Sequence, residues 1–224
     1  YIWNTTVFTD GTYIIILKVY DNANNFATDE ISVIVDNTLP LVDIIEPVSG
    51  AKLSGTITIS FAASDTNLVG VMFAIRSPST FNVAGTAFLH WDTTTVDDGP
   101  HTITIIAIDK AGNMGSASIT VTVDNTPPIA DIVTPSNNSY MRGTIEIEVT
   151  GEDINFNRTE LYINGRLVTS WNASGTKTYH WNTATLTDST YIIVLKVYDN
   201  ADNFATDEIS VTVDNTSPIA EIRA

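Results

Sequence analysis

The first forty residues of the chain recur almost unchanged near its other end. Residues 1–40 match residues 179–218 at 31 of 40 positions, with a constant offset of 178. Residues 89–128 form a third, more distant copy that matches the first at 16 of 40 positions. Such a chain is a tandem array in which each unit repeats the same fold. Arrays without a visible catalytic site usually provide length, spacing or a surface.

Each copy ends in the same boundary phrase, Asp-Asn-Thr followed by any residue and then proline. The phrase occupies residues 36–40, 124–128 and 214–218, at spacings of 88 and 90 residues. This spacing is the size of a small domain and too long for a solenoid repeat. We therefore expect the C-terminal half of a domain at 1–40, complete domains at 41–128 and 129–218, and the first strand of a following domain at 219–224.

Residues 1–40 contain only the later strands of a domain. We expect preceding residues of a longer polypeptide to complete them, so that this chain is an excerpt. The alternative is completion by another subunit through strand exchange. The closer match of the first and third units favours a two-domain super-repeat of 178 residues in the parent protein.

The amino-acid composition argues against several classes of binding partner. A net charge of −16, with only 10 basic residues, argues against nucleic acid and against docking on an anionic membrane surface. There is no cysteine for a disulfide framework. No apolar run approaches the roughly 20 residues needed to span a bilayer. The few charged and many Thr, Ser and Asn residues indicate an extracellular or cell-surface location.

The hydrophobic pattern has a period of two throughout, which is typical of strands. In the last unit one face carries Tyr191, Ile193, Leu195 and Val197, and Lys196 marks the opposite face. The corresponding inward residues are Tyr13, Ile15, Leu17 and Val19 in the first unit and His101, Ile103, Ile105 and Ala107 in the second. A tryptophan recurs beside these strands and is predicted to fill the core at Trp3, Trp91 and Trp181.

About seven short strands per unit with frequent turns predict an all-β chain of tandem Ig-like antiparallel β-sandwiches. In the last unit we place the strands near 129–134, 144–150, 159–164, 166–170, 178–183, 190–198 and 204–213. The Asn164-Gly165 pair is a strong two-residue hairpin signal.

The phrases within a unit resemble those of bacterial Ig-like domains, which have an immunoglobulin or fibronectin III-like fold and occur in prokaryotic cell-surface proteins. In the second unit these phrases are Trp91-Asp-Thr93, Asp98-Gly-Pro-His-Thr-Ile103, Asp109-Lys-Ala-Gly-Asn113 and residues 121–128. The resemblance covers essentially the whole chain. It implies the fold and a surface context, but these modules serve as stalks, adhesin arms, filament segments and spacers of secreted enzymes, so it does not assign an activity.

No residues suggest catalysis. The chain has three histidines, and His90 and His180 occupy one equivalent position that carries Ile2 in the first unit. A hydrolase needs a nucleophile with a positioned base or a carboxylate pair in a pocket, and no such set is visible. We expect no enzyme activity, no catalytic residues and structural or surface roles for His90, His101 and His180.

Calcium is the most plausible ligand, because hard cations prefer carboxylate and carbonyl oxygens. Asp and Asn recur in the loops and boundary phrases, where a bound ion would stiffen the joint between domains. The same residues also suit turns, in which Asn and Asp cap the backbone and adopt left-handed conformations. The candidate ligands are Asp65, Asn67, Asp109, Asn113, Asp124, Asp153, Asn155, Asp199, Asn203 and Asp214.

Five Asn-x-Ser/Thr sequons could carry glycans in a secreted protein. They lie at Asn4, Asn137, Asn157, Asn172 and Asn215. We expect Asn137, Asn157 and Asn172 to be the better sites because they fall in predicted loops.

We expect this chain to be a structural, extracellular segment of an Ig-like array that forms a stalk, surface layer or filament. Apolar residues on the outer faces favour lateral self-association: Ile14, Ile16 and Tyr20 with Ile192, Val194 and Tyr198. One alternative is an adhesin arm whose loops bind a glycan or protein receptor, with residues 76–86 as the candidate surface. Another is a spacer of a secreted enzyme.

Overall fold

The structure, a computed structural model, describes residues 1–74, 79–81 and 85–222. The chain forms antiparallel β-sandwiches in tandem, which confirms the predicted fold class. It divides into two compact units. The first contains residues 1–51, 57–91 and 100–121, and the second contains 52–56, 92–99 and 122–224. Across the described ranges, no helix has the length and apolar character needed to cross a membrane.

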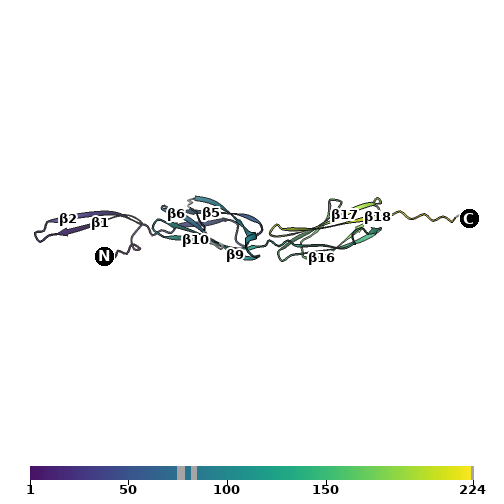
Figure 1. Cartoon of the computed structure of the whole chain (residues 1–224), viewed down its shortest axis with the longest axis horizontal. Coiled ribbons are helices and arrows are strands. Elements are labelled where there is room, and N and C mark those ends of the chain that lie inside the picture. The colour runs from purple at the N-terminus through teal and green to yellow at the C-terminus, as the bar shows by residue number, and fades with distance from the viewer. Residues whose placement is uncertain (75–78, 82–84, 223–224) are drawn as a thin grey trace. The chain divides into compact units, whose positions relative to one another are not determined.

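Residues 1–40 form a long antiparallel hairpin of two strands (Figure 1). Strand β1 spans Gly11–Tyr20 and β2 spans Phe26–Val35, with Gly11 opposite Val35 and Tyr20 opposite Phe26. The turn between them is closed by Asp21, whose Oδ1 accepts hydrogen bonds from the backbone N–H groups of Ala23 and Asn25. The two strands are the equivalents of the last two strands of a complete repeat.

The next repeat contains a five-stranded and a three-stranded sheet. The larger has the order β4-β10-β9-β6-β7 and the smaller β3-β5-β8. The short 3₁₀ helix η1 (Thr93–Thr95) follows β8. The bounds of the strands are Leu41–Glu46 (β3), Lys52–Leu53 (β4), Thr56–Ser64 (β5), Leu68–Ala74 (β6), Ser79–Phe81 (β7), Gly85–Asp92 (β8), Gly99–Asp109 (β9) and Met114–Val123 (β10).

The last repeat has the same two sheets, ordered β12-β18-β17-β14-β15 and β11-β13-β16. The seven predicted strands are all present, and the short β12 is an additional strand that pairs in parallel with β18. The bounds are Ile129–Thr134 (β11), Tyr140–Met141 (β12), Thr144–Glu152 (β13), Phe156–Ile163 (β14), Arg166–Trp171 (β15), Gly175–Asn182 (β16), Ser189–Asp199 (β17) and Phe204–Val213 (β18).

The core of the last repeat lies between its two sheets and follows the predicted alternation. Every second residue of β17 is buried: Ile193, Leu195 and Val197 are 0 % exposed. Residues from the facing sheet, among them Ile147, Val149 and Trp181, complete the cluster. In the preceding repeat the equivalent Ile103, Ile105 and Ala107 are also fully buried, together with Trp91.

The hairpin of β1 and β2 differs, although its sequence is nearly the same. The set predicted to point inward is exposed here, with Ile15, Leu17 and Val19 42 %, 63 % and 58 % exposed, because residues 1–40 supply only one hairpin of a domain. The alternating sequence pattern correctly predicted that these side chains share one face of the strand. That face is exposed because no second sheet packs against the hairpin in the structure.

Gly151 on β13 marks a place where the sandwich packs too closely for a side chain. A Cβ atom there would lie 2.2 Å from Thr159 Oγ1 and 3.1 Å from Val197 Cγ2. Because Thr159 is itself buried, we expect Gly151→Ala to destabilise the last repeat by about 1–3 kcal/mol, the usual cost of overpacking. Urea unfolding measures this change, and a loss below about 0.5 kcal/mol would show that the interior can adjust.

Candidate functional site

Two clusters of three aspartates form at equivalent places in the two units. The first contains Asp36, Asp65 and Asp109, and the second Asp124, Asp153 and Asp199. In each cluster one aspartate belongs to a boundary phrase, the second begins a turn after a strand, and the third is the last residue of a long strand. Two loops of a repeat are thus joined to the boundary phrase that precedes it.

The carboxylates of each cluster face a common centre. One oxygen from each of the three aspartates lies within 4.8 Å of the other two. Asp109 is buried in the first cluster, and both Asp124 and Asp199 are buried in the second. Within the described ranges, none of these six carboxylates forms an ion pair with a basic side chain. Each cluster therefore concentrates negative charge that the protein itself does not neutralise.

Asparagine amides hold the clusters in shape. Asn155 Nδ2 donates to Asp124 Oδ2 at 2.6 Å, and Asn203 Nδ2 donates both to Asp199 Oδ2 and to the carbonyl of Asp124, each at 2.7 Å. Asn67 and Asn113 make the equivalent bonds in the first cluster. The Nδ2 groups of these four asparagines position the carboxylates, and the role of their Oδ1 atoms as ligands stays a prediction.

Burial and the crowding of three carboxylates in the second cluster change the pKa of Asp153. Burial raises the pKa of Asp153 above its ordinary value of 3.8, and the negative charges of Asp124 and Asp199 add to this increase. At Asp109 burial acts in the same direction, but hydrogen bonds, first from the Asn113 side chain, outweigh it and lower the pKa. The ionised form of Asp153 is therefore less stable than that of a free aspartate, and a cation nearby would offset this cost.

The donor set fits a hard divalent cation. Calcium binds oxygen atoms at about 2.3–2.6 Å, so two of its ligands can lie up to about 5 Å apart, and the 4.8 Å limit within each cluster agrees with this range. Three carboxylates would supply part of its coordination shell. Asp36 was not predicted as a ligand, although it occupies the same place in its phrase as Asp124. Asp214, which was predicted as a ligand together with Asp124, is not part of any such cluster among the described residues.

The rest of the boundary phrase is clamped to its own repeat by an aspartate that was not among the predicted site residues. The backbone N–H of Asn215 donates to Asp188 Oδ1 at 2.7 Å, and Thr216 Oγ1 donates to Asp188 Oδ2 at 2.5 Å. Asp98 makes the same pair of contacts with Asn125 and Thr126, and Asp10 with Asn37 and Thr38. The signal in the sequence was an aspartate 26 residues before the first residue of each phrase.

The proline that ends the first phrase packs directly on the repeat that follows. A Cβ atom at Gly115 on β10 would lie 1.7 Å from the carbonyl oxygen of Pro40. Only glycine allows this approach, since any side chain would overlap the backbone of the phrase. Together with the Asp36 contacts, it attaches the phrase to the body of its unit.

The clamp makes stability depend on pH. The hydroxyl of Thr216 and then the amide of Asn215 hold the pKa of Asp188 below its ordinary value of 3.8. A carboxyl whose pKa is lowered by folding stabilises the fold above its unfolded-state pKa, and this contribution is lost as the pH falls through the folded value. We expect the melting temperature of the last repeat to fall as the pH drops below about 4, and to fall less steeply in Asp188→Asn. Parallel slopes for the two proteins would contradict this role.

The other predicted residues occupy varied surroundings. Trp91 and Trp181 are buried and Trp3 is half-buried, with Trp3 in edge-on contact with Phe8 and Tyr13. His90 and His180 are exposed, and His90 Nδ1 lies 3.2 Å from Thr58 Oγ1.

The glycosylation sites remain predictions. Asn4, Asn137, Asn157 and Asn172 are exposed, although Asn157 lies in β14 and not in the predicted loop. The Nδ2 atom of Asn215, where a sugar would be attached, donates to the carbonyls of Thr183 and Leu186. A glycan there would have to break both hydrogen bonds.

The faces proposed for lateral contact differ between the repeats. Ile14, Ile16 and Tyr20 are exposed on the hairpin, whereas Ile192, Val194 and Tyr198 are half-buried. The guanidinium of Arg158 stacks on the ring of Tyr198 at 3.9 Å, so side chains of the same repeat cover part of that face. Most of the candidate receptor loop, 76–86, lies outside the described residues.

Sequence comparison finds the same family in both complete repeats. The family described as "Bacterial Ig domain" matches residues 40–105 and 128–194, which together make up more than half of the chain. A second family, "Bacterial Ig-like domain (group 3)", matches residues 85–160. No curated protein sequence matches the chain.

Structure comparison finds solved proteins that are similar to this chain. The fibronectin(III)-like modules of Clostridium thermocellum CbhA align over 82 % of this chain and 100 % of theirs, with 19 % identity and a TM-score of 0.50. A tetra-tandem repeat from the extending region of a large adhesion protein aligns over 92 % of this chain and 57 % of its own length, with 20 % identity and a TM-score of 0.40. At these identities the likeness concerns the fold alone.

Proposed function

Because this chain belongs to the bacterial Ig-like domain family, we propose that it is a structural segment of an extracellular array, a spacer whose joints are stiffened by calcium. Domains of this family are typically non-catalytic modules and are commonly found at the cell surface. The repeated aspartate clusters carry the proposal. In each of them a boundary phrase and two loops of the following repeat contribute carboxylates to one centre.

The mechanism is the removal of bending freedom at each boundary. A short linker of Asp-Asn-Thr-x-Pro has few rotatable bonds, since proline fixes one backbone angle. The clamp formed by Asp98 or Asp188 holds the phrase to its own repeat. A cation shared by Asp124, Asp153 and Asp199 would hold it to the next. The two attachments together would turn a flexible linker into a stiff joint, as a stalk or filament requires.

Small-angle X-ray scattering of the 224-residue chain tests the proposal. In calcium we expect a narrow distribution of interatomic distances with a fixed maximum, and in EGTA a broader distribution, because the joints bend. A variant carrying Asp65→Asn and Asp153→Asn should scatter alike in both buffers. Equal scattering of the unmodified chain in calcium and in EGTA would reject calcium stiffening, and bending joints in both buffers would reject the rigid spacer.

A further inference from the structure

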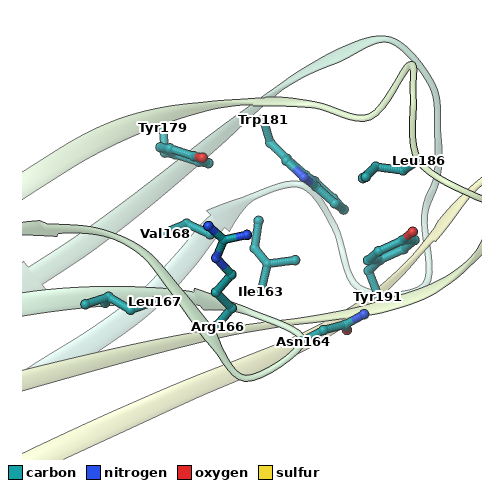
Figure 2. Close-up of a pocket in the computed structure, with 9 residues that line it drawn as sticks. All are labelled: Ile163, Asn164, Arg166, Leu167, Val168, Tyr179, Trp181, Leu186 and Tyr191. Carbon is teal, nitrogen blue, oxygen red and sulfur yellow. The ribbon is translucent and has the colours of Figure 1, made fainter.

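The last repeat contains a cavity of about 410 Å³ beside the β14–β15 hairpin. Ile163 at the end of β14 and Tyr191 near the start of β17 line it, whereas Asp153 and Asp199 of the second aspartate cluster lie at the other ends of these two strands. β15 is the edge strand of the larger sheet and β16 the edge strand of the smaller one. Three aromatic side chains line the cavity, namely Tyr179, Trp181 and Tyr191, and Ile163 adds an apolar surface. Figure 2 shows the guanidinium of Arg166 reaching from the hairpin toward the strand that carries Tyr179 and Trp181.

The polar groups of this cavity are mainly donors without partners. Within the described part of the chain, the Arg166 side chain forms no ion pair, hydrogen bond or ring contact, and the Tyr179 hydroxyl forms no hydrogen bond. The indole N–H of Trp181 is also unpaired, and it must be accessible because no described side-chain nitrogen or oxygen is both fully buried and unpaired. Asn164 Oδ1 already accepts from the backbone N–H of Ile192 at 2.8 Å, which leaves its amide N–H groups as donors.

This donor set selects for a ligand that is rich in acceptors. No Asp or Glu lines the cavity, although acidic residues outnumber basic ones by 26 to 10 in the chain. A carboxylate matches the planar guanidinium fork of Arg166 and forms charge-assisted hydrogen bonds with it. A purely apolar ligand would instead cover that charge without pairing it, which is unfavourable.

We propose that this cavity binds a carboxylate-bearing sugar residue, a uronic acid of an acidic polysaccharide. Its carboxylate pairs with Arg166, its hydroxyl oxygens accept from Tyr179 and the Trp181 indole, and the C–H face of its ring packs on the aromatic wall. The net charge of −16 opposes the approach of an anion. At physiological salt, however, repulsion between exposed charges is largely screened beyond about 8 Å, so the contact with Arg166 determines binding.

The test is an NMR titration of the full chain with trigalacturonate and with its methyl ester, which keeps the rings and removes the charge. Both titrations are run in EGTA, so that the aspartate clusters cannot contribute through bound calcium. We expect the indole N–H signal of Trp181 to shift, while those of Trp3 and Trp91, its equivalents in the other repeats, stay in place. The acid should bind at least about tenfold more tightly than the ester, because hydrogen bonds to charged groups are the stronger ones.

Two arginine variants sharpen the test. Arg166→Gln should weaken trigalacturonate binding at least about tenfold, with an unchanged melting temperature, because Arg166 is exposed. Arg142→Gln removes another exposed arginine outside the cavity and should leave binding unchanged. Equal affinity for acid and ester, equal effects of the two variants, or no shift of the Trp181 signal would overturn the proposal. Tighter binding of a short peptide through its C-terminal carboxylate would overturn the assignment to a sugar.

Discussion

Leu195→Ala is expected to destabilise the last repeat by about 3 kcal/mol, since truncating a buried leucine removes its hydrophobic contacts and leaves a cavity. Leu195 is 0 % exposed between the two sheets. Leu17 occupies the same place in a nearly identical sequence but is 63 % exposed on the hairpin. Leu17→Ala should therefore change the stability by less than about 0.5 kcal/mol, as is usual for surface substitutions.

Urea unfolding of the 224-residue chain measures the loss of stability in each variant. Hydrogen exchange of the backbone amides in β17 and in β1 then shows which of the two strands is affected. Comparing the two substitutions separates the effect of burial from that of local sequence, because the neighbouring residues of the two leucines are almost the same. Equal losses from the two substitutions would mean that another body of protein, such as a second chain, covers the hairpin in solution.

Calcium is expected to stabilise the last repeat by about 2.7 kcal/mol at a free concentration of one hundred times its dissociation constant, from the linkage between binding and folding. Asp153→Asn should abolish this gain, because it removes one of the three carboxylates of the second cluster. In EGTA the same substitution should stabilise the protein or leave it unchanged. The raised pKa of Asp153 means that its charged form is less stable in the folded than in the unfolded chain, so removing the charge relieves that cost.

Calorimetric titration with calcium measures the number of ions that the same variant binds. The unmodified chain has two aspartate clusters, so Asp153→Asn should reduce the number of bound calcium ions from two to one. Asp131→Asn, which removes an exposed carboxylate outside both clusters, serves as the control and should bind two. A stoichiometry that is the same in both variants would exclude the second cluster as a calcium site.

Much of the fold could be predicted from the repeats. Alternation along 190–198 identified the buried face of β17, and the recurrent turns placed the seven main strands of the last repeat. The two-residue β12 could not be predicted, because a segment of that length has no periodicity. Alternation shows which face of a strand is apolar but not whether a second sheet covers it. The exposure of Leu17 follows instead from the repeat boundaries, which assign only half a domain to residues 1–40.

The candidate site was predicted in part. The recurrence of Asp65, Asp109, Asp153 and Asp199 in loops indicated oxygen ligands at one end of a sandwich. It did not predict the hydrogen bonds from the asparagine Nδ2 groups to the carboxylates, because these depend on the orientation of each side chain. The clamp aspartates were missed for a similar reason. Asp188 lies 26 residues before Asp214, and only the folded hairpin of β17 and β18 brings this part of the chain back to the phrase.

The boundary phrase has a consequence for how an array of these repeats would unfold. Within residues 124–126, Asn125 and Thr126 are bonded to Asp98 of their own repeat, while Asp124 accepts from Asn155 of the next. When a repeat unfolds, it releases the clamp and leaves one carboxylate of the following cluster on a flexible segment. The neighbour loses stability as a result, so the repeats behave as a one-dimensional system with nearest-neighbour coupling. A break would then spread from the ends of the array, and its terminal repeats would set its lifetime under load.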